Sequence, residues 1–153
     1  MLCSRTYMRT ASSPPAHCLL SDLRYLVDTD WVIHYLNGHP EIVGHIQDLN
    51  PQGVGLSVIS LAELYEGVFY SRHPRKSEEE LQDFLRGFEL VGIDEQVTRV
   101  FGRVRGRLRA EGKTVGDLDL LIGATALQLG LTLLTNNRRH FELIEKLQIV
   151  SVC

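Results

Sequence analysis

The stretch DLDLLIGATALQLGLTLLTNN, residues 117–137, decides the fold of this chain. From Leu120 to Leu129, apolar residues cover nearly the whole circumference of a helical wheel, which is typical of a buried helix. Gly130 ends that helix, and the apolar run 131–135 predicts a buried strand directly after it. A buried helix followed by a buried strand indicates a parallel sheet that helices cover on its faces.

The rest of the chain alternates between short apolar strands and helices. The predicted strands are 24–27, 54–57, 90–93, 131–135 and 148–152. The predicted helices are 29–36, 40–49, 60–70, 77–88, 94–112, 117–130 and 138–145. We expect Ser60 to be the N-cap of the third helix and Ser77 to begin a capping box, while Asp117 or Asp119 opens the long apolar helix. This alternation predicts the α/β class.

Size and composition describe an ordinary globular chain of one domain. It has 153 residues, 44% of them apolar and 23% charged, and a net charge of −3, which gives no global sign of nucleic-acid binding. Residues 1–22 lack the apolar core of a secretory signal, so we expect a poorly ordered extension before a domain at 23–153. The three cysteines, Cys3, Cys18 and Cys153, follow no ligand spacing, and no apolar run reaches the length of a membrane span. Together these features favour a reducing, cytoplasmic setting and no membrane.

Four polar residues stand where apolar runs begin or end: Asp28, Glu63, Asp119 and Asn137. Residues just past strand ends, or in the helix turn that follows, gather along one edge of an α/β sheet. Carboxylates that converge there repel one another unless a cation joins them. Oxygen ligands without Cys point to Mg²⁺ or Mn²⁺ rather than zinc.

Each of these residues also has a purely structural explanation. Asp28 precedes a helix and fits an N-cap, and Asp117 or Asp119 fits the same role for the buried helix. Glu63 lies in a first helical turn, where a solvated glutamate is favourable, and Asn137 fits a turn. Two aspartates within three residues, however, exceed what capping needs. Together the residues therefore favour a metal site.

The sequence also resembles a known family through four motifs in order. These are YLVDTD at 25–30, ISLAEL at 59–64, GDLDLLIGA at 116–124 and LLTNNRRHF at 133–141. They look like the signatures of PIN-domain ribonucleases, in particular the VapC-type toxins of bacterial toxin–antitoxin pairs. The resemblance runs from about Leu23 to the C-terminus.

This resemblance implies a three-layer α/β/α fold with a central parallel sheet and metal-dependent endoribonuclease activity. Asp28, Glu63 and Asp119 match the acidic metal-site residues, Asn137 a fourth polar position, and Thr135 a hydroxyl beside the site. Mg²⁺ or Mn²⁺ would activate water and neutralise the phosphate, so that cleavage leaves a 5′-phosphate and a 3′-hydroxyl. The implied partners are an RNA substrate, a cognate antitoxin and a second copy of the chain.

Two positions depart from many relatives. Asp30 stands where many have Asn, and His140 stands where some have an acidic residue, which predicts weaker binding of a second metal ion. We expect Asp117 to be able to supply the missing charge as a further metal ligand.

Arginines flank the apolar face of the helix predicted at 94–112. Arg99, Arg103 and Arg107 lie along one side of it, and Arg105 and Arg109 along the other. They fit either a solvated amphipathic helix or an RNA backbone contact. For the RNA contact we predict four residues, Arg99, Arg103, Arg107 and Arg138. Gly102 and Gly106, four residues apart, indicate close approach of a partner helix or a twofold mate.

Two rival functions stay open from sequence. Asp28 and Asp30 imitate the nucleophile and acid of haloacid-dehalogenase-like phosphatases, although only Lys113 lies near the later acidic pair. The other rival is a catalytically weak PIN module that binds RNA or a partner, which the histidine at His140 leaves possible.

Overall fold

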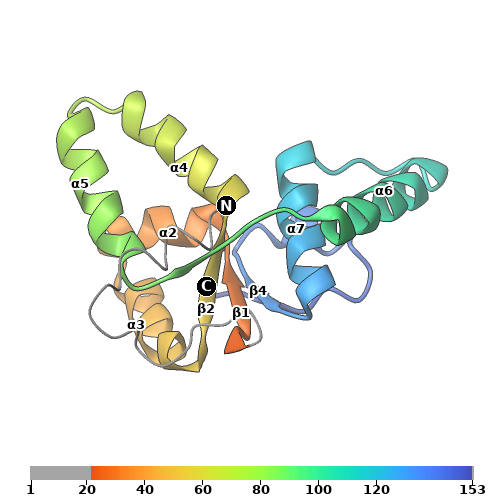
Figure 1. Ribbon diagram of the computed structural model, residues 1–153, viewed down its shortest axis with the longest axis horizontal. Helices are drawn as coiled ribbons and strands as arrows, with labels where there is room; N and C mark the ends of the chain where they lie inside the picture. Colours follow the sequence, from red (N-terminus) through yellow and green to blue (C-terminus); the bar gives the residue numbers. More distant parts are fainter. Residues whose placement is uncertain (1–21, 153) are drawn as a thin grey trace.

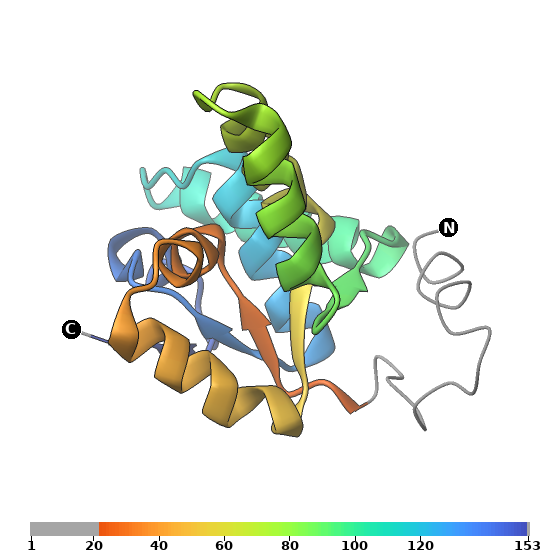
Figure 2. The same ribbon diagram turned by 90° about the vertical axis from the view of Figure 1, so that its left-hand side faces the viewer.

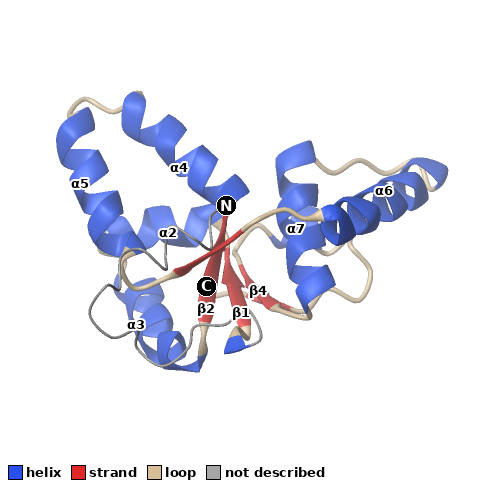
Figure 3. Cartoon of the chain, in the orientation of Figure 1, coloured by secondary structure: helices blue, strands red, loops and turns tan. Residues whose placement is uncertain are grey.

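The structure, a computed structural model, describes residues 22–152 as one sheet between two groups of helices (Figure 1). The strands are β1 (Tyr25–Val27), β2 (Val54–Ser57), β3 (Glu89–Val91), β4 (Thr132–Leu134) and β5 (Ile149–Val150). The helices are α2 (Thr29–Leu36), α3 (Pro40–Leu49), α4 (Val58–Phe69), α5 (Pro74–Leu85), α6 (Glu95–Ala110), α7 (Asp117–Leu129) and α8 (Arg138–Phe141), with a 3₁₀ turn η2 (Asn50–Gln52). The predicted three-layer α/β/α fold is confirmed (Figure 3).

The sheet is parallel throughout, with the strand order β3-β2-β1-β4-β5. The chain builds outward from β1 to β3 on one side and then adds β4 and β5 on the other side of β1. Val27, at the end of β1, pairs in register with Leu56 on β2 and Leu134 on β4. The order therefore reverses between β1 and β4, and ligand sites of open α/β sheets form beyond the carboxyl ends of the strands at such a point.

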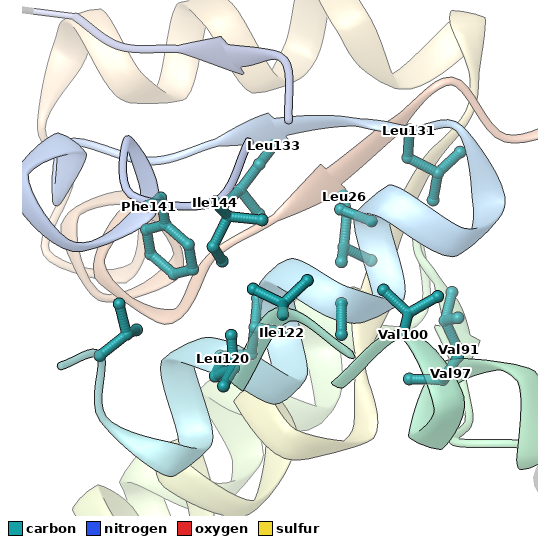
Figure 4. Packing of buried hydrophobic residues seen from close by; sticks show 14 of the residues in the cluster. Leu26, Val91, Val97, Val100, Leu120, Ile122, Leu131, Leu133, Phe141 and Ile144 are labelled. Carbon is teal, nitrogen blue, oxygen red and sulfur yellow. The ribbon is translucent and has the colours of Figure 1, made fainter. Parts of the chain in front are cut away.

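Successive strand residues face two separate cores because side chains alternate along a strand. Leu26 and Leu133 are buried on the face that α6 and α7 cover, as Figure 4 shows. Val27 and Leu134 are buried on the opposite face. Figure 2 shows α3 and α5 in front of that second face. Both faces of the sheet are thus dry, as the apolar strands predicted.

The start of α4 differs from the prediction. Ser57 is its N-cap, and the Ser57 hydroxyl accepts a 3.1 Å hydrogen bond from the backbone N–H of Ile59. Because the last residue of β2 is itself the cap, the strand leads into the helix without a loop. The prediction of Ser60 as the cap was therefore wrong; Ser60 is buried inside α4, and its hydroxyl has no hydrogen-bond partner among the described residues.

The start of α5 also differs. The helix begins at Pro74, whose fixed φ suits a first helical position, and it ends at Leu85 rather than at residue 88. Ser77 lies inside the helix, where its hydroxyl donates a 3.0 Å hydrogen bond to that of Ser71. The predicted capping box at Ser77 was wrong because the proline had already started the helix.

Helix α6 has the N-cap that the sequence predicted, whereas the aspartates suggested as caps of α7 do not cap it. Asp94 caps α6 through a 2.9 Å bond from the backbone N–H of Val97 to its side chain, as predicted. Helix α7 opens at Asp117, but its N-cap is Gly116 and no side chain caps it. Capping therefore accounts for neither Asp117 nor Asp119.

Some predictions fall on parts of the chain that the structure does not describe. Of the expected extension at 1–22 only Asp22 is described, and Cys3, Cys18 and Cys153 all lie outside the described residues. Between residues 22 and 152, no helix has the length and apolarity that crossing a membrane requires.

Candidate active site

Asp28 lies at the switch point of the sheet. Its backbone N–H donates a 2.9 Å hydrogen bond to the carbonyl oxygen of Leu134, so that β1 and β4 end together. Asp28 occupies the N-cap position of α2, yet its side chain makes no capping bond. Instead Oδ2 accepts a 2.7 Å bond from the hydroxyl of Thr135. With 4% of its surface exposed, this aspartate is a buried acid rather than a helix cap.

Thr135 and Asp30 tie the loop after β4 to the start of α2. The Thr135 oxygen accepts a 3.0 Å bond from the backbone N–H of Asn137. Asp30 accepts a 2.9 Å bond from the backbone N–H of Asn136 and a 2.8 Å bond from that of Trp31. Asp30 is thus a structural link between the two segments as well as a second negative charge beside Asp28.

Glu63 reaches the same region from α4. Its Oε1 accepts a 2.7 Å hydrogen bond from the hydroxyl of Thr29, the residue that follows Asp28. The glutamate is partly buried. The structure therefore places it against the start of α2 rather than leaving it as a solvated residue of a helical turn.

Asp119 approaches from the first turn of α7, where 21% of its side chain is exposed. Its Oδ2 lies 2.7 Å from Nδ1 of His140, which α8 carries. The side-chain nitrogen of Asn137 lies 3.5 Å from the same carboxylate oxygen and 3.1 Å from His140 Nδ1. Asp119, Asn137 and His140 thus form one side-chain cluster.

The pKa values of two carboxyl groups show that the acids share one field. Burial raises the pKa of Asp28 to about 7, the charges of Asp30 and Asp119 add to the rise, and the Thr135 hydrogen bond opposes it. Burial also raises the pKa of Glu63, and the charge of Asp119 contributes there too. Within residues 22–152, no Lys, Arg or His nitrogen lies within 4.0 Å of a carboxylate oxygen of Asp28 or Glu63.

The chemistry of the acids fits a divalent cation, although their side chains do not converge on a common metal position in the described structure. Among the described residues, no three His, Cys, Asp or Glu side chains are already arranged around a metal position. Hydrogen bonds from Thr29, Thr135 and His140 each take one carboxylate oxygen. The negative charge of Asp119 raises the pKa of both Asp28 and Glu63, and a hard cation stabilises oxygen donors in such a field, so the donor set fits such an ion.

Asp117, the other predicted ligand, is placed differently. Its carboxylate forms an ion pair with Arg105, and 77% of its side chain is exposed. Neither Asp28 nor Glu63 has Asp117 among the charges that shift its pKa. The structure therefore does not bring Asp117 into the acidic cluster.

The four predicted RNA-binding arginines occupy different environments. Arg99 and Arg103 are exposed on α6. Arg107 donates a 2.8 Å bond to the carbonyl oxygen of Leu143 and pairs with Glu111, so its guanidinium is held against the protein. Arg138 pairs with Glu142 at 2.7 Å. Of these four arginines, Arg99 and Arg103 are the two whose guanidinium groups form no ion pair or hydrogen bond with the described residues.

Sequence reasoning left several site contacts out. Thr29 was not singled out, although it directly follows Asp28, and neither was the 3.0 Å bond from the Trp31 indole N–H to the side-chain oxygen of Asn136. The position of Thr29 directly after Asp28 was a usable signal. In the structure its hydroxyl donates to a carboxylate, as that of Thr135 does. The pairing of Asp119 with His140 has no sequence signal, because it depends on how α7 and α8 pack.

Fold and site together define an open parallel α/β protein with an acidic cluster at the switch point. The PIN domain family model matches residues 25–147, and the chain belongs to this family. Nucleases of the family generally depend on divalent metal ions. The match favours the nuclease class over the phosphatase alternative.

Named relatives agree with the family assignment. The chain is 33% identical over 121 residues to "Ribonuclease VapC2" of Haemophilus influenzae, covering 78% of this chain and 91% of that protein. It is 30% identical over 131 residues to "tRNA(fMet)-specific endonuclease VapC" of Salmonella typhimurium, covering 86% and 99%. The structure of VapBC2 from Rickettsia felis bound to a promoter DNA fragment aligns with a TM-score of 0.81 and 28% identity, covering 86% of this chain and all of that one.

Proposed function

We propose that this chain is a divalent-metal-dependent endoribonuclease and the toxin of a toxin–antitoxin pair. The observation that carries the proposal is Asp28, buried at the switch point with a pKa raised to about 7 beside the charges of Asp30 and Asp119. Placing carboxylates so near one another costs stability unless a cation joins them. The names of its relatives, ribonuclease and tRNA endonuclease, supply the substrate class.

The residues divide the work as follows. Asp28 and Asp119 would hold the ion directly, and Glu63 would hold it or orient a water beside it. When bound, Mg²⁺ or Mn²⁺ supplies an activated water and a counter-charge for the phosphate. Thr135 fixes the Asp28 carboxylate, and Asn137 orients the water or the phosphate through its amide.

Arg99 and Arg103, exposed on α6, would contact the RNA backbone. Asp117 is left out of this set because Arg105 engages it.

A protein antitoxin is the proposed partner. The Rickettsia felis and Salmonella typhimurium structures that align with this chain are VapBC complexes. Association of two copies of the chain stays a prediction. Gly102 and Gly106 on α6 leave open space within 4 Å of where a Cβ would stand, so no other part of the described chain approaches them.

The test is cleavage of RNA by the purified full-length chain with Mg²⁺, with Mn²⁺ and with EDTA. We expect cleavage products with 5′-phosphate ends in either metal, none in EDTA, and at least a 100-fold loss of rate in Asp119→Ala. Asp48→Ala, at an exposed position on α3, is the matched control and should cleave like wild type. Induction without an antitoxin should arrest growth, and Asp119→Ala should relieve the arrest.

Three results would contradict the proposal. Cleavage that persists in EDTA would remove the metal from the mechanism. Hydrolysis of para-nitrophenyl phosphate with RNA left intact would favour the phosphatase. Binding of RNA or antitoxin without cleavage in any divalent metal would favour a non-catalytic module.

A further inference from the structure

The two ends of the acidic cluster offer different donor atoms. Around Asp28 the neighbouring side chains present hydroxyl and carboxylate oxygens. Around Asp119 the nearest side-chain atom is a ring nitrogen, Nδ1 of His140, at 2.7 Å. The His140 side chain is half-exposed, with 47% of its surface accessible, so an ion can reach it from solvent. The Asp119 end is therefore a mixed nitrogen and oxygen site.

Three donor groups at this end form a triangle. Its edges are 2.7 Å from Asp119 Oδ2 to His140 Nδ1, 3.1 Å from that nitrogen to the Asn137 amide, and 3.5 Å from the amide to Oδ2. Adjacent ligands of a six-coordinate ion with bonds of about 2.1 Å lie roughly 3 Å apart. A half-turn of the Asn137 amide puts its oxygen where its nitrogen stands. The triangle thus has the dimensions of one face of an octahedron.

The packing of α7 against α8 keeps this triangle in place. Gly123, one turn after Asp119, has Ile144 and Phe141 against it so tightly that an added Cβ would lie 2.3 Å from Ile144 Cδ1 and 3.5 Å from Phe141 Cδ1. Phe141 follows His140 directly and is fully buried. The backbone positions of Asp119 and His140 are therefore set by the core rather than by a mobile loop.

We propose that His140 is a nitrogen ligand on the Asp119 side of the metal site, and that the site therefore prefers Mn²⁺ or another transition-metal ion to Mg²⁺. Imidazole suits transition metals, whereas Mg²⁺ takes oxygen ligands almost exclusively. Asp119 supplies an oxygen beside it, and the Asn137 amide lies at the third corner of the triangle. The inference rests on the proposed function in that the ion is the one that serves RNA cleavage.

The competing explanation is that His140 only positions Asp119. In that case the 2.7 Å hydrogen bond persists when the ion binds, and the imidazole stays outside the coordination sphere. The hydrogen bond needs a proton on Nδ1, from which the nitrogen donates to Asp119, whereas a metal ligand needs the lone pair of the same nitrogen, so the two roles exclude each other. Spectroscopy of the bound ion distinguishes them, because only a ligand nitrogen couples directly to the metal.

The experiment is pulsed EPR of Mn²⁺ bound to the full-length chain, together with calorimetric titration of Mn²⁺ and Mg²⁺. We expect ¹⁴N coupling of imidazole size in wild type and at least tenfold tighter binding of Mn²⁺ than of Mg²⁺. His140→Asp should abolish the coupling and reduce the preference for Mn²⁺ at least tenfold. His73→Ala, at an exposed histidine before α5 that makes no capping bond, should match wild type in both measurements.

Failure of this inference is distinguishable from failure of the proposed function. Wild type that binds Mn²⁺ without ¹⁴N coupling, or coupling that survives in His140→Asp, would overturn the ligand role even if RNA is still cleaved with metal. No Mn²⁺ binding and no RNA cleavage in any divalent metal would overturn both. Absence of ¹⁴N coupling in the wild-type spectrum overturns the ligand role by itself, whether or not the variant folds.

Discussion

The hydroxyl of Thr135 donates a 2.7 Å hydrogen bond to Oδ2 of Asp28 and so joins the carboxyl ends of β4 and β1 at the switch point of the sheet. The same oxygen accepts the backbone N–H of Asn137 at 3.0 Å. One buried threonine thus fixes both the central carboxylate and the loop that leads to Asn137 and His140.

Removing that hydroxyl should damage the site more than the fold. Thr135→Val keeps the shape of the side chain but leaves Asp28 and the Asn137 N–H without their common partner. Loss of such a supporting bond costs about 10- to 100-fold in metal affinity or activity. RNA cleavage rates and calorimetric metal binding check this. Thr135→Ser, which keeps the hydroxyl, should stay within a few-fold of wild type; equal losses in the two variants would show that the hydroxyl is not what matters.

The raised pKa of Asp28 predicts how stability depends on pH in the absence of metal. Its pKa rises from the ordinary 3.8 to about 7 on folding. At a pH between these two values, Asp28 is protonated in the folded protein and ionised in the unfolded chain. The free energy of unfolding should therefore fall as pH rises from 4 to 7, by up to about 1.4 kcal/mol per pH unit. Urea denaturation in EDTA across this range measures the slope.

Substitutions and metal separate this effect from others. Asp28→Asn should remove most of the slope and stabilise the metal-free protein at pH 8. Glu63→Gln should act in the same direction, because the pKa of Glu63 is also raised. Saturating Mn²⁺ should abolish the fall in wild type, and exposed Asp48→Asn should leave it unchanged. A pH dependence of the free energy of unfolding in EDTA that is the same in wild type and in Asp28→Asn would contradict a raised pKa of Asp28.

The sequence predicted those parts of the site that depend on where strands end. Asp28 and Thr135 follow the paired residues Val27 and Leu134, so a parallel register necessarily brings them together. The carboxylate of Asp119 could likewise be recognised because it lies in the first turn of a buried helix, although its neighbours could not. Its contact with His140 depends on the approach of α8 to α7, which side-chain packing decides.

Errors arose where one element runs straight into another. Capping preferences assume a loop before each helix, but Ser57 both ends β2 and caps α4, so the next serine was chosen wrongly. The prediction of Asp117 as a further metal ligand is a separate matter, because it rested on proximity in sequence to Asp119. Residues two apart on a helix point in different directions, and Arg105 on α6 takes its carboxylate.

A pair of glycines tests the packing that carries Asp119 and His140. Gly123→Ala should destabilise the fold by about 1–3 kcal/mol, because its Cβ would lie 2.3 Å from Ile144 Cδ1 in a filled core. It should also weaken metal binding by moving α8. Gly102→Ala, which meets nothing within 4 Å on α6, should instead stabilise the helix by about 0.5–1 kcal/mol. Thermal unfolding of both variants measures the contrast, and equal effects would contradict the tight contact of α7 with α8.

The exposed arginines of α6 should appear in the salt dependence of RNA binding. Each phosphate contact on a single strand contributes about 0.7 to the slope of log K against log salt concentration. The double substitution Arg99→Ala and Arg103→Ala should therefore lower the slope by roughly 1.4. RNA binding is measured by fluorescence anisotropy. All variants also carry Asp119→Ala, which prevents cleavage during the measurement. Arg75→Ala on α5 with Arg86→Ala at its C-cap is the control, and an equal loss there would mean that α6 is not the RNA-binding face.

The most direct measurement is the position of Mn²⁺ in crystals of the full-length chain, located by its anomalous scattering. We predict one peak in contact with carboxylate oxygens of both Asp28 and Asp119, with Glu63 coordinating the ion or a water bound to it, and no contact with Asp117. A peak elsewhere on the protein, or none at Mn²⁺ concentrations that support RNA cleavage, would contradict the claim that these acids share a metal ion.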